Sequence, residues 1–253
     1  MVGGFDPASL CPLKGCRVSW TILDQWSNCT SVMITRGRNQ LDERLQARER
    51  LRKLPAEQRD RWLDIAEAEF RSCGFEAASL NGILSRAGLS KGQAYYYFAD
   101  KGELYRAVIA RAFDELAGLV TFDDAGARTA NGFWLELGAF FERLTVILGQ
   151  NDRLAELGRG IYREARAQEA IADLLDTLRA RFVQVMERGR GLGAVRSDLP
   201  LDLLTDMAFG MVREADRWFA LNTGELDGDR ALALNRQVFA LFVQLLAPVS
   251  DIS

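Results

Sequence analysis

A group of hydrogen-bond donors follows a glycine turn in the first half of the chain. Lys91, Gln93 and Tyr95 come directly after the sequence Ala-Gly-Leu-Ser, and Gly92 lies between the first two. Lysine and glutamine donate to phosphates or to the edges of bases, and a glycine lets the backbone come close to a partner. These residue types at the start of a helix are typical of helices that enter the major groove of DNA.

Two short helices with a tight turn must position these donors. Ser79 is suited to cap the first helix, which has Ile83 on its apolar face. Gly88 favours the left-handed conformation that ends a helix, and Ser90 is suited to cap the next one, which begins at Lys91. The spacing therefore predicts a helix-turn-helix.

The flanking sequence predicts two further helices. Residues 61–74 carry apolar side chains at helical spacing up to Gly74, and a fourth helix is expected from Glu103 to about Leu119. This fourth helix would join the DNA-binding part to the rest of the chain.

The run IAEAEFRSCGFEAASLNGILSRAGLSKGQAYYYFADKGEL resembles the N-terminal DNA-binding domain of the TetR (tetracycline repressor) family. The most specific parts are the helix ending in F-x-x-x-G-F, the turn A-G-L-S-K-G, and Y-x-x-F followed by lysine. The resemblance implies an all-α protein with an N-terminal three-helix domain and a helical ligand-binding and dimerisation domain. We expect residues 1–54 to be a largely disordered leader with a basic arm, 55–105 the DNA-binding domain and 106–253 the helical domain.

The resemblance also implies which residues face DNA and which pack the small core. The DNA-facing set is Ser79, Ser90, Lys91, Gly92, Gln93, Tyr95, Tyr96 and Lys101, and the core set is Ile83, Ala87, Leu89 and Phe98. Tyr97 is interpreted as a core residue, and Tyr96 fits either packing or DNA contact. Gln93 stands where threonine is common in the family, so the operator sequence stays open.

Composition agrees with a two-part protein outside membranes. The chain has 253 residues, 48% hydrophobic and 26% charged, with a net charge of −3. It has no run of 18 apolar residues and no secretion signal, which predicts a cytoplasmic location without membrane contact. Residues 1–32 are expected to be disordered or to precede a true start at Met33.

Basic charge is concentrated just before the DNA-binding region. Between Ile34 and Lys53, seven basic residues stand against three acidic ones. This segment could lie along phosphates or enter the minor groove. A solvated helix with Leu41, Leu45 and Leu51 lightly packed fits the pattern equally well.

Nothing in the sequence indicates catalysis or a metal or other cofactor. The chain has no histidine, which excludes histidine-based triads and histidine-ligated metals. Its four cysteines lack metal-site spacing. The string from Gly189 to Ala194 resembles a dinucleotide loop, but it follows a helical segment and is interpreted as a helix end.

The remainder of the chain has helical periodicity, with helices predicted near 133–149, 152–167, 169–189, 200–222 and 229–247. The resemblance implies a small-molecule cavity among them. The candidate lining residues are Trp134, Phe140, Phe141, Tyr162, Phe182, Met186, Met207, Met211 and Trp218. Apolar stripes of this kind also form ordinary cores. Excess apolar surface on the last helix predicts that the last two helices pair with a second copy.

These observations together predict a dimeric regulator that binds a palindromic site on double-stranded DNA. We expect a repressor that a small apolar or aromatic molecule releases from its operator. An activator with the same DNA-binding domain is the alternative within regulation. A helical enzyme or ligand-storage protein is the alternative from another class.

Overall fold

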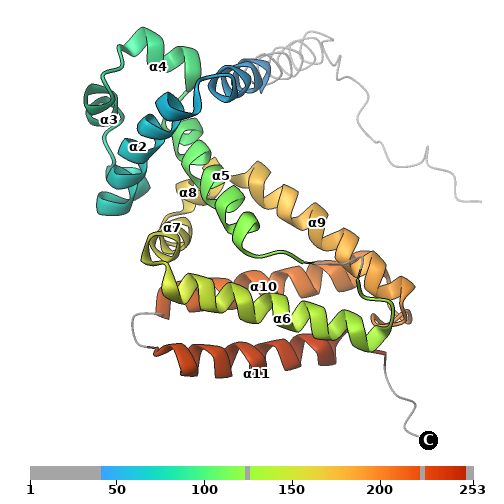
Figure 1. The fold of residues 1–253 in the computed structure, drawn as a ribbon. Coiled ribbons are helices and arrows are strands. Elements are labelled where there is room, and N and C mark those ends of the chain that lie inside the picture. Colours follow the sequence, from blue (N-terminus) through green and yellow to red (C-terminus); the bar gives the residue numbers. More distant parts are fainter. Residues whose placement is uncertain (1–40, 123–125, 223–225, 249–253) are drawn as a thin grey trace, which may run out of the picture. The chain divides into compact units, whose positions relative to one another are not determined.

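The computed structural model describes residues 41–122, 126–222 and 226–248, and every regular element within these ranges is an α-helix (Figure 1). The predicted all-α class is therefore confirmed. The chain divides into two compact units, Met1–Gln46 and Ala47–Ser253. Of the first unit only residues 41–46 are described, and they are helical. The expected disorder of residues 1–40 lies outside the described residues, but residues 47–52 are also helical where a largely disordered segment was expected.

Ten helices of the described chain have defined bounds. The first four are α2 (Ala56–Ala77), α3 (Leu80–Ala87), α4 (Lys91–Tyr97) and α5 (Lys101–Leu119). The others are α6 (Ala130–Gln150), α7 (Asp152–Arg163), α8 (Ala165–Ala170), α9 (Ala172–Gly191), α10 (Leu201–Asn222) and α11 (Gly228–Leu246). None of the described helices is long and apolar enough to cross a membrane.

The predicted helix over 152–167 is wrong in its C-terminal part. Its α7 segment ends at Arg163, because Glu164 adopts an extended conformation with φ −135° and ψ 128°. A separate short helix, α8, follows, and α9 then begins at Ala172 instead of 169. The expected helix end at the Gly189–Ala194 string is confirmed, since α9 ends at Gly191 and Gly193 has φ +70°.

One hydrophobic core lies under the helix-turn-helix and extends beyond it. It contains Trp62 and Phe70 of α2, Ile83 of α3, and Phe98, which follows α4. It also contains buried residues of α5, α7 and α8, among them Leu154. The small domain therefore shares its core with helices that come much later in the sequence.

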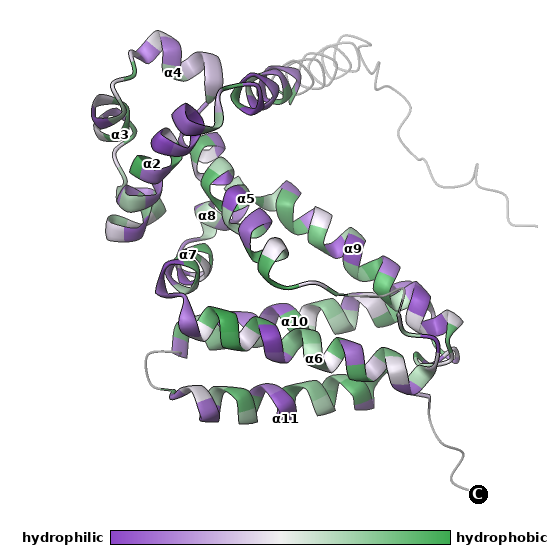
Figure 2. Ribbon diagram, viewed as in Figure 1, coloured by the Kyte–Doolittle hydropathy of each residue, from purple (hydrophilic) through white to green (hydrophobic). Residues whose placement is uncertain are grey.

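A second core joins α6, α9, α10 and α11. Phe133, Met186, Leu204 and Leu246 are fully buried in it. Phe239 and the aromatic rings around it pack in edge-on, tilted and stacked arrangements along α6 and α11. Figure 2 shows the matching pattern, with α6 and α11 hydrophobic along much of their length and α4 hydrophilic to neutral.

Buried ion pairs fix α2 and α5 against later helices. The carboxylate of Glu67, a residue only 5% exposed, accepts hydrogen bonds from Arg111 of α5 and Arg153 of α7, both at 2.8 Å. The buried Glu103 accepts two hydrogen bonds from Arg48, which also contacts Asp173 of α9. Such charges remain buried because each has its partner, and removing one partner would be costly.

A carboxylate from the α7–α8 junction accepts hydrogen bonds from the backbone at a kink in α2. Gly74 has φ +81° and interrupts the helix, which leaves the next amide groups without helical acceptors. Glu164 accepts hydrogen bonds from the backbone N–H groups of Phe75 at 3.1 Å and Glu76 at 2.6 Å. A Cβ atom on residue 74 would lie 2.3 Å from Glu164 Oε1. The left-handed φ therefore favours glycine at this position, and any larger residue would also have to displace the Glu164 carboxylate.

Candidate nucleic-acid interface

The turn between α3 and α4 is built from the predicted serine and glycine signals. The Ser79 hydroxyl accepts a hydrogen bond from the N–H of Gly82 at 3.1 Å and caps α3. Gly88 adopts the left-handed conformation with φ 70° and ψ 26°, and the N–H of Leu89 donates to Leu84 O at 2.9 Å. This arrangement satisfies the last carbonyls of α3 and turns the chain sharply into α4.

A reciprocal capping box begins the recognition helix α4. The N–H of Gln93 donates to the Ser90 hydroxyl at 3.3 Å, and the N–H of Ser90 donates to Gln93 Oε1 at 3.1 Å. Two amide groups that the helix leaves unpaired are thereby satisfied. The Gln93 side chain consequently has a structural task, and its Nε2 is the part left to donate to DNA.

The faces of α4 separate packing residues from candidate DNA contacts. Ala94 and Phe98 are buried in the core, and Tyr97 packs against Trp62 with 5.4 Å between ring centroids. On the opposite face, Lys91, Gly92 and Gln93 are exposed, and so are Tyr95 (59%) and Tyr96 (53%). The core interpretation of Tyr97 is confirmed, and the exposed face carries the donors that DNA recognition requires.

Tyr96 is held by an arginine from the segment that precedes α2. The Arg50 guanidinium lies 4.3 Å from the centre of the Tyr96 ring and donates a hydrogen bond to Tyr96 O at 2.9 Å. Cation–π contact of this kind orders an exposed aromatic ring. Arg50 was not among the predicted site residues, because a single cation in a basic run gives no positional signal.

Lys101 has partners within the protein. Its ammonium donates to Glu76 O at 2.9 Å and Ala78 O at 3.2 Å, and lies 4.9 Å from the centre of the Phe75 ring. An ammonium has three N–H bonds, so these contacts leave one for a phosphate. The lysine therefore closes the loop after α2 in addition to any contact with DNA.

The basic segment before α2 is largely neutralised by acidic neighbours. Arg52 and Lys53 both pair with Glu49, and these contacts hold the pKa of the Glu49 carboxyl down at about 2. Arg48 is bound to Glu103 and Asp173. Leu51 is buried, which matches the alternative of a packed helix better than a free basic arm for residues 47–52.

The predicted ligand-lining residues fall into several separate groups in the described chain. Trp134, Phe141, Phe182, Met186 and Met211 belong to the second core, and Phe140 pairs with Phe122 and Phe141. Tyr162 packs against the first core and donates to Asp216 Oδ2 at 2.5 Å. Met207 and Trp218 are exposed, at 47% and 44%, because the stripe they form points away from both cores.

Acidic residues and cysteines in the described chain form no metal site. No group of three or more such side chains is placed to hold an ion within the described ranges. Cys73, which is exposed, donates to the Glu69 carbonyl through its thiol.

The helix-turn-helix coincides with a known family signature. Residues 63–108 match the family model described as bacterial regulatory proteins, tetR family. This match places the helix-turn-helix region of the chain, residues 63–108, among tetR-family sequences. It confirms the resemblance in the sequence, and it covers most of α2, the whole of α3 and α4, and the first part of α5.

Relatives and solved structures of transcriptional regulators resemble the chain beyond the helix-turn-helix. The transcriptional repressor KstR2 of Mycolicibacterium smegmatis is 25% identical over 173 residues, which cover 65% of this chain and 80% of the relative. The transcriptional activator FasR of the same species is 43% identical over 65 residues, 25% of this chain and 30% of the relative. The crystal structure of the regulator FadR from Bacillus subtilis in complex with stearoyl-CoA has a TM-score of 0.57 at 19% identity, and it covers 73% of this chain and 97% of that one.

Proposed function

We propose that this protein is a dimeric repressor that leaves its operator when a small apolar molecule binds the C-terminal helices. The observation that carries DNA binding is the exposed face of α4, where Lys91, Gln93 and Tyr95 stand free of the core on a helix fixed by its capping box. Lys91 supplies charge to phosphates, and the Gln93 amide supplies a donor to base edges.

A dimer is supported by apolar side chains that the single chain leaves in water. Leu203, Met207, Trp218 and Leu221 on α10 are each at least 44% exposed, and Leu241 on α11 is 56% exposed. The α10 residues follow helical spacing and form one stripe. Pairing α10 and α11 with their copies would bury this surface in a four-helix bundle. A two-fold dimer presents two copies of α4, so the operator should be palindromic.

An apolar effector is supported by the aromatic lining of the second core and by the ligand of FadR. Trp134, Phe141 and Phe182 surround Phe242 with ring centroids 6.2 to 6.3 Å apart. Aromatic side chains and the flexible Met211 can rearrange around an apolar guest. FadR binds stearoyl-CoA, which has a long apolar chain. We assign Met207 and Trp218 to the dimer surface instead of the effector site.

Repression is favoured over activation because the match to a repressor extends over more of the relative than the match to an activator. KstR2, a repressor, matches 80% of its own length, whereas FasR, an activator, matches 30%. The FasR match therefore supports only the type of DNA-binding domain, and it does not distinguish repression from activation. Because chromosomal DNA is the partner, we place the protein in the bacterial cytoplasm.

Selection of bound duplexes from a random pool with the full-length chain tests the proposal. We expect a two-fold symmetric site, protected over two successive major grooves on one side of the duplex. Lys91→Ala should weaken binding to it, and Arg181→Ala, an exposed arginine on α9, is the matched control. A pool without any enriched sequence would refute sequence-specific binding.

The effector part is tested on the selected operator with stearoyl-CoA and with coenzyme A alone. A release of about tenfold in affinity requires about 1.4 kcal/mol of preferential binding to the DNA-free conformation. We expect stearoyl-CoA to release the operator and coenzyme A to leave it bound. If a panel of apolar compounds bound the protein without changing operator affinity, release by an effector would be wrong.

A further inference from the structure

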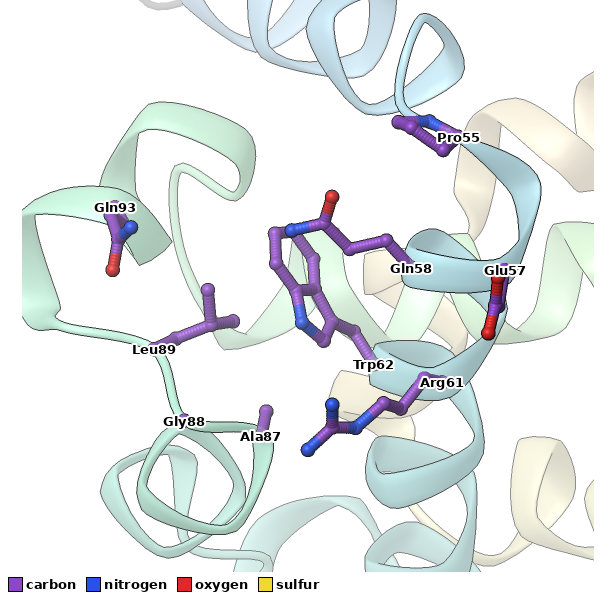
Figure 3. Close-up of a pocket in the computed structure, with 9 residues that line it drawn as sticks. All are labelled: Pro55, Glu57, Gln58, Arg61, Trp62, Ala87, Gly88, Leu89 and Gln93. Carbon is purple, nitrogen blue, oxygen red and sulfur yellow. The ribbon is translucent and has the colours of Figure 1, made fainter.

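A groove runs between the start of α2 and the helix-turn-helix (Figure 3). It has a volume of about 450 Å³. Gln58, Arg61 and Trp62 line it from α2, Leu89 lines it from the turn, and Gln93 lines it from α4. The recognition helix therefore forms one wall, so the groove is continuous with the proposed DNA-contacting face.

Arg61 is the charged donor of the groove. It is exposed and has no hydrogen-bond or ion-pair partner among the residues that the structure describes. Arginines around it differ in this respect, since Arg59 pairs with Asp60 and Arg86 pairs with Glu69. Figure 3 shows the Arg61 side chain extending along the groove below Trp62. A guanidinium without an acidic partner is available to an anion.

The other walls supply amides and an apolar floor. The Gln93 carbonyl oxygen is occupied by the N–H of Ser90, so its Nε2 remains a donor, and the amide of Gln58 is exposed. Trp62 and Leu89 form the floor through their partly or fully buried side chains. Glu57 also borders the groove, but Figure 3 shows its carboxylate on the outer side of α2, away from Arg61.

Donors above an apolar floor match the chemistry of a sugar–phosphate backbone. Phosphate oxygens accept hydrogen bonds from guanidinium and amide groups, and the apolar edge of a deoxyribose packs on carbon atoms. We propose that this groove receives one sugar–phosphate segment of the operator strand, with Arg61 as the phosphate-binding residue. The proposal rests on the proposed DNA-binding function. It adds a fixed backbone contact beside the base contacts of α4, and Gln93 borders both.

Three full-length variants test the groove on the selected operator and on an unrelated duplex over a series of salt concentrations. Arg61→Ala should weaken binding to both duplexes by about tenfold, because a charged hydrogen bond to phosphate is lost irrespective of sequence. It should also reduce the slope of log affinity against log salt by about 0.9. Arg61→Lys should keep the slope. Arg71→Ala, an exposed arginine further along α2, is the control and should match the parent.

Ethylation interference identifies the contact directly. Ethylation of one particular phosphate in each half-site should prevent binding of the parent protein, whereas Arg61→Ala should bind the ethylated and the unmodified DNA equally. If Arg61→Ala bound both duplexes like the parent, or if Arg71→Ala weakened binding equally, the proposal would be overturned. A second outcome would also overturn the proposal. If Arg61→Ala kept its operator affinity, and inorganic phosphate raised the melting temperature of the parent but not that of Arg61→Ala, the groove would be a site for a small anion. Failure of the parent to select any DNA would refute the proposed function instead.

Discussion

Helix α4 and the pair α10–α11 both leave large side chains in water, but the chemistry of those side chains differs. On α4 they are Tyr95 and Tyr96, which carry hydroxyl groups and stand next to Lys91 and Gln93. On α10 and α11 they are leucine, methionine and tryptophan at helical spacing. Similar exposure therefore has different meanings: the first surface is suited to phosphates and base edges, the second to another apolar surface.

The largest effect should come from placing a charge on the apolar surface. Leu241→Glu would put an unpaired carboxylate from each chain into the proposed dimer contact, at a cost of about 3 kcal/mol or more. We expect a monomer in analytical ultracentrifugation and loss of operator binding. Leu178→Glu on α9, where the leucine is 44% exposed outside the α10–α11 pair, is the control and should stay dimeric. If Leu241→Glu remained dimeric, α11 would not be part of the dimer interface.

Two substitutions of Gln93 separate its structural task from recognition. Gln93→Glu keeps an acceptor for the N–H of Ser90 and should leave stability within about 0.5 kcal/mol, whereas Gln93→Ala should destabilise by about 1 kcal/mol. Both remove the Nε2 donor and should change base preference by about 1–3 kcal/mol at one position per half-site. Urea titration and repeated selection measure the two effects. Unchanged base preference in both variants would exclude Gln93 from readout.

Removing one hydroxyl tests the tyrosines of α4. Tyr95→Phe keeps the ring and removes the donor, so binding to every duplex should weaken by about 1 kcal/mol, or about fivefold. Tyr97→Phe is the control, because that ring packs against Trp62 on the opposite face. Fluorescence anisotropy at fixed salt gives both affinities. Equal affinities for parent and Tyr95→Phe would show that exposure of the ring serves some other purpose.

The smallest effect concerns Asp216, an exposed residue of α10 that accepts a hydrogen bond from Tyr162. Partial desolvation raises the pKa of the Asp216 carboxyl above its usual 3.8, although the hydrogen bond from Tyr162 acts in the opposite direction. The folded protein thus binds this proton more tightly than the unfolded chain, so stability falls as pH rises from about 4. Asp216→Asn should be more stable than the parent at pH 7, by less than about 1 kcal/mol because the residue remains partly solvated. Urea titrations should show that the difference in unfolding free energy between Asp216→Asn and the parent disappears near pH 4. The same difference in unfolding free energy at pH 7 and at pH 4 would exclude ionisation of Asp216 as the cause.

The helix-turn-helix could be predicted from the sequence because its signals are local. Ser79, Gly88 and Ser90 each act on backbone groups within a few residues, and all three behave as expected. The positions of Met207 and Trp218 could not be predicted, because periodicity identifies a stripe without telling which partner covers it. Contacts between distant residues, such as Glu164 with the kink in α2, leave no pattern in the chain. The sequence does not single out the groove residue Arg61, because one arginine in the second turn of a helix has no characteristic spacing.

The shared first core limits how this regulator can be rebuilt by recombination. A chimera that joined α2–α5 to a foreign sensor would lose the side chains of Leu154, Leu157 and Ile161, which cover the DNA-binding helices from α7. It would also lose Glu164, the acceptor that closes α2. A transferable module must therefore carry α7 and α8 along with the helix-turn-helix, even though they are separated from it in the gene by the whole of α6.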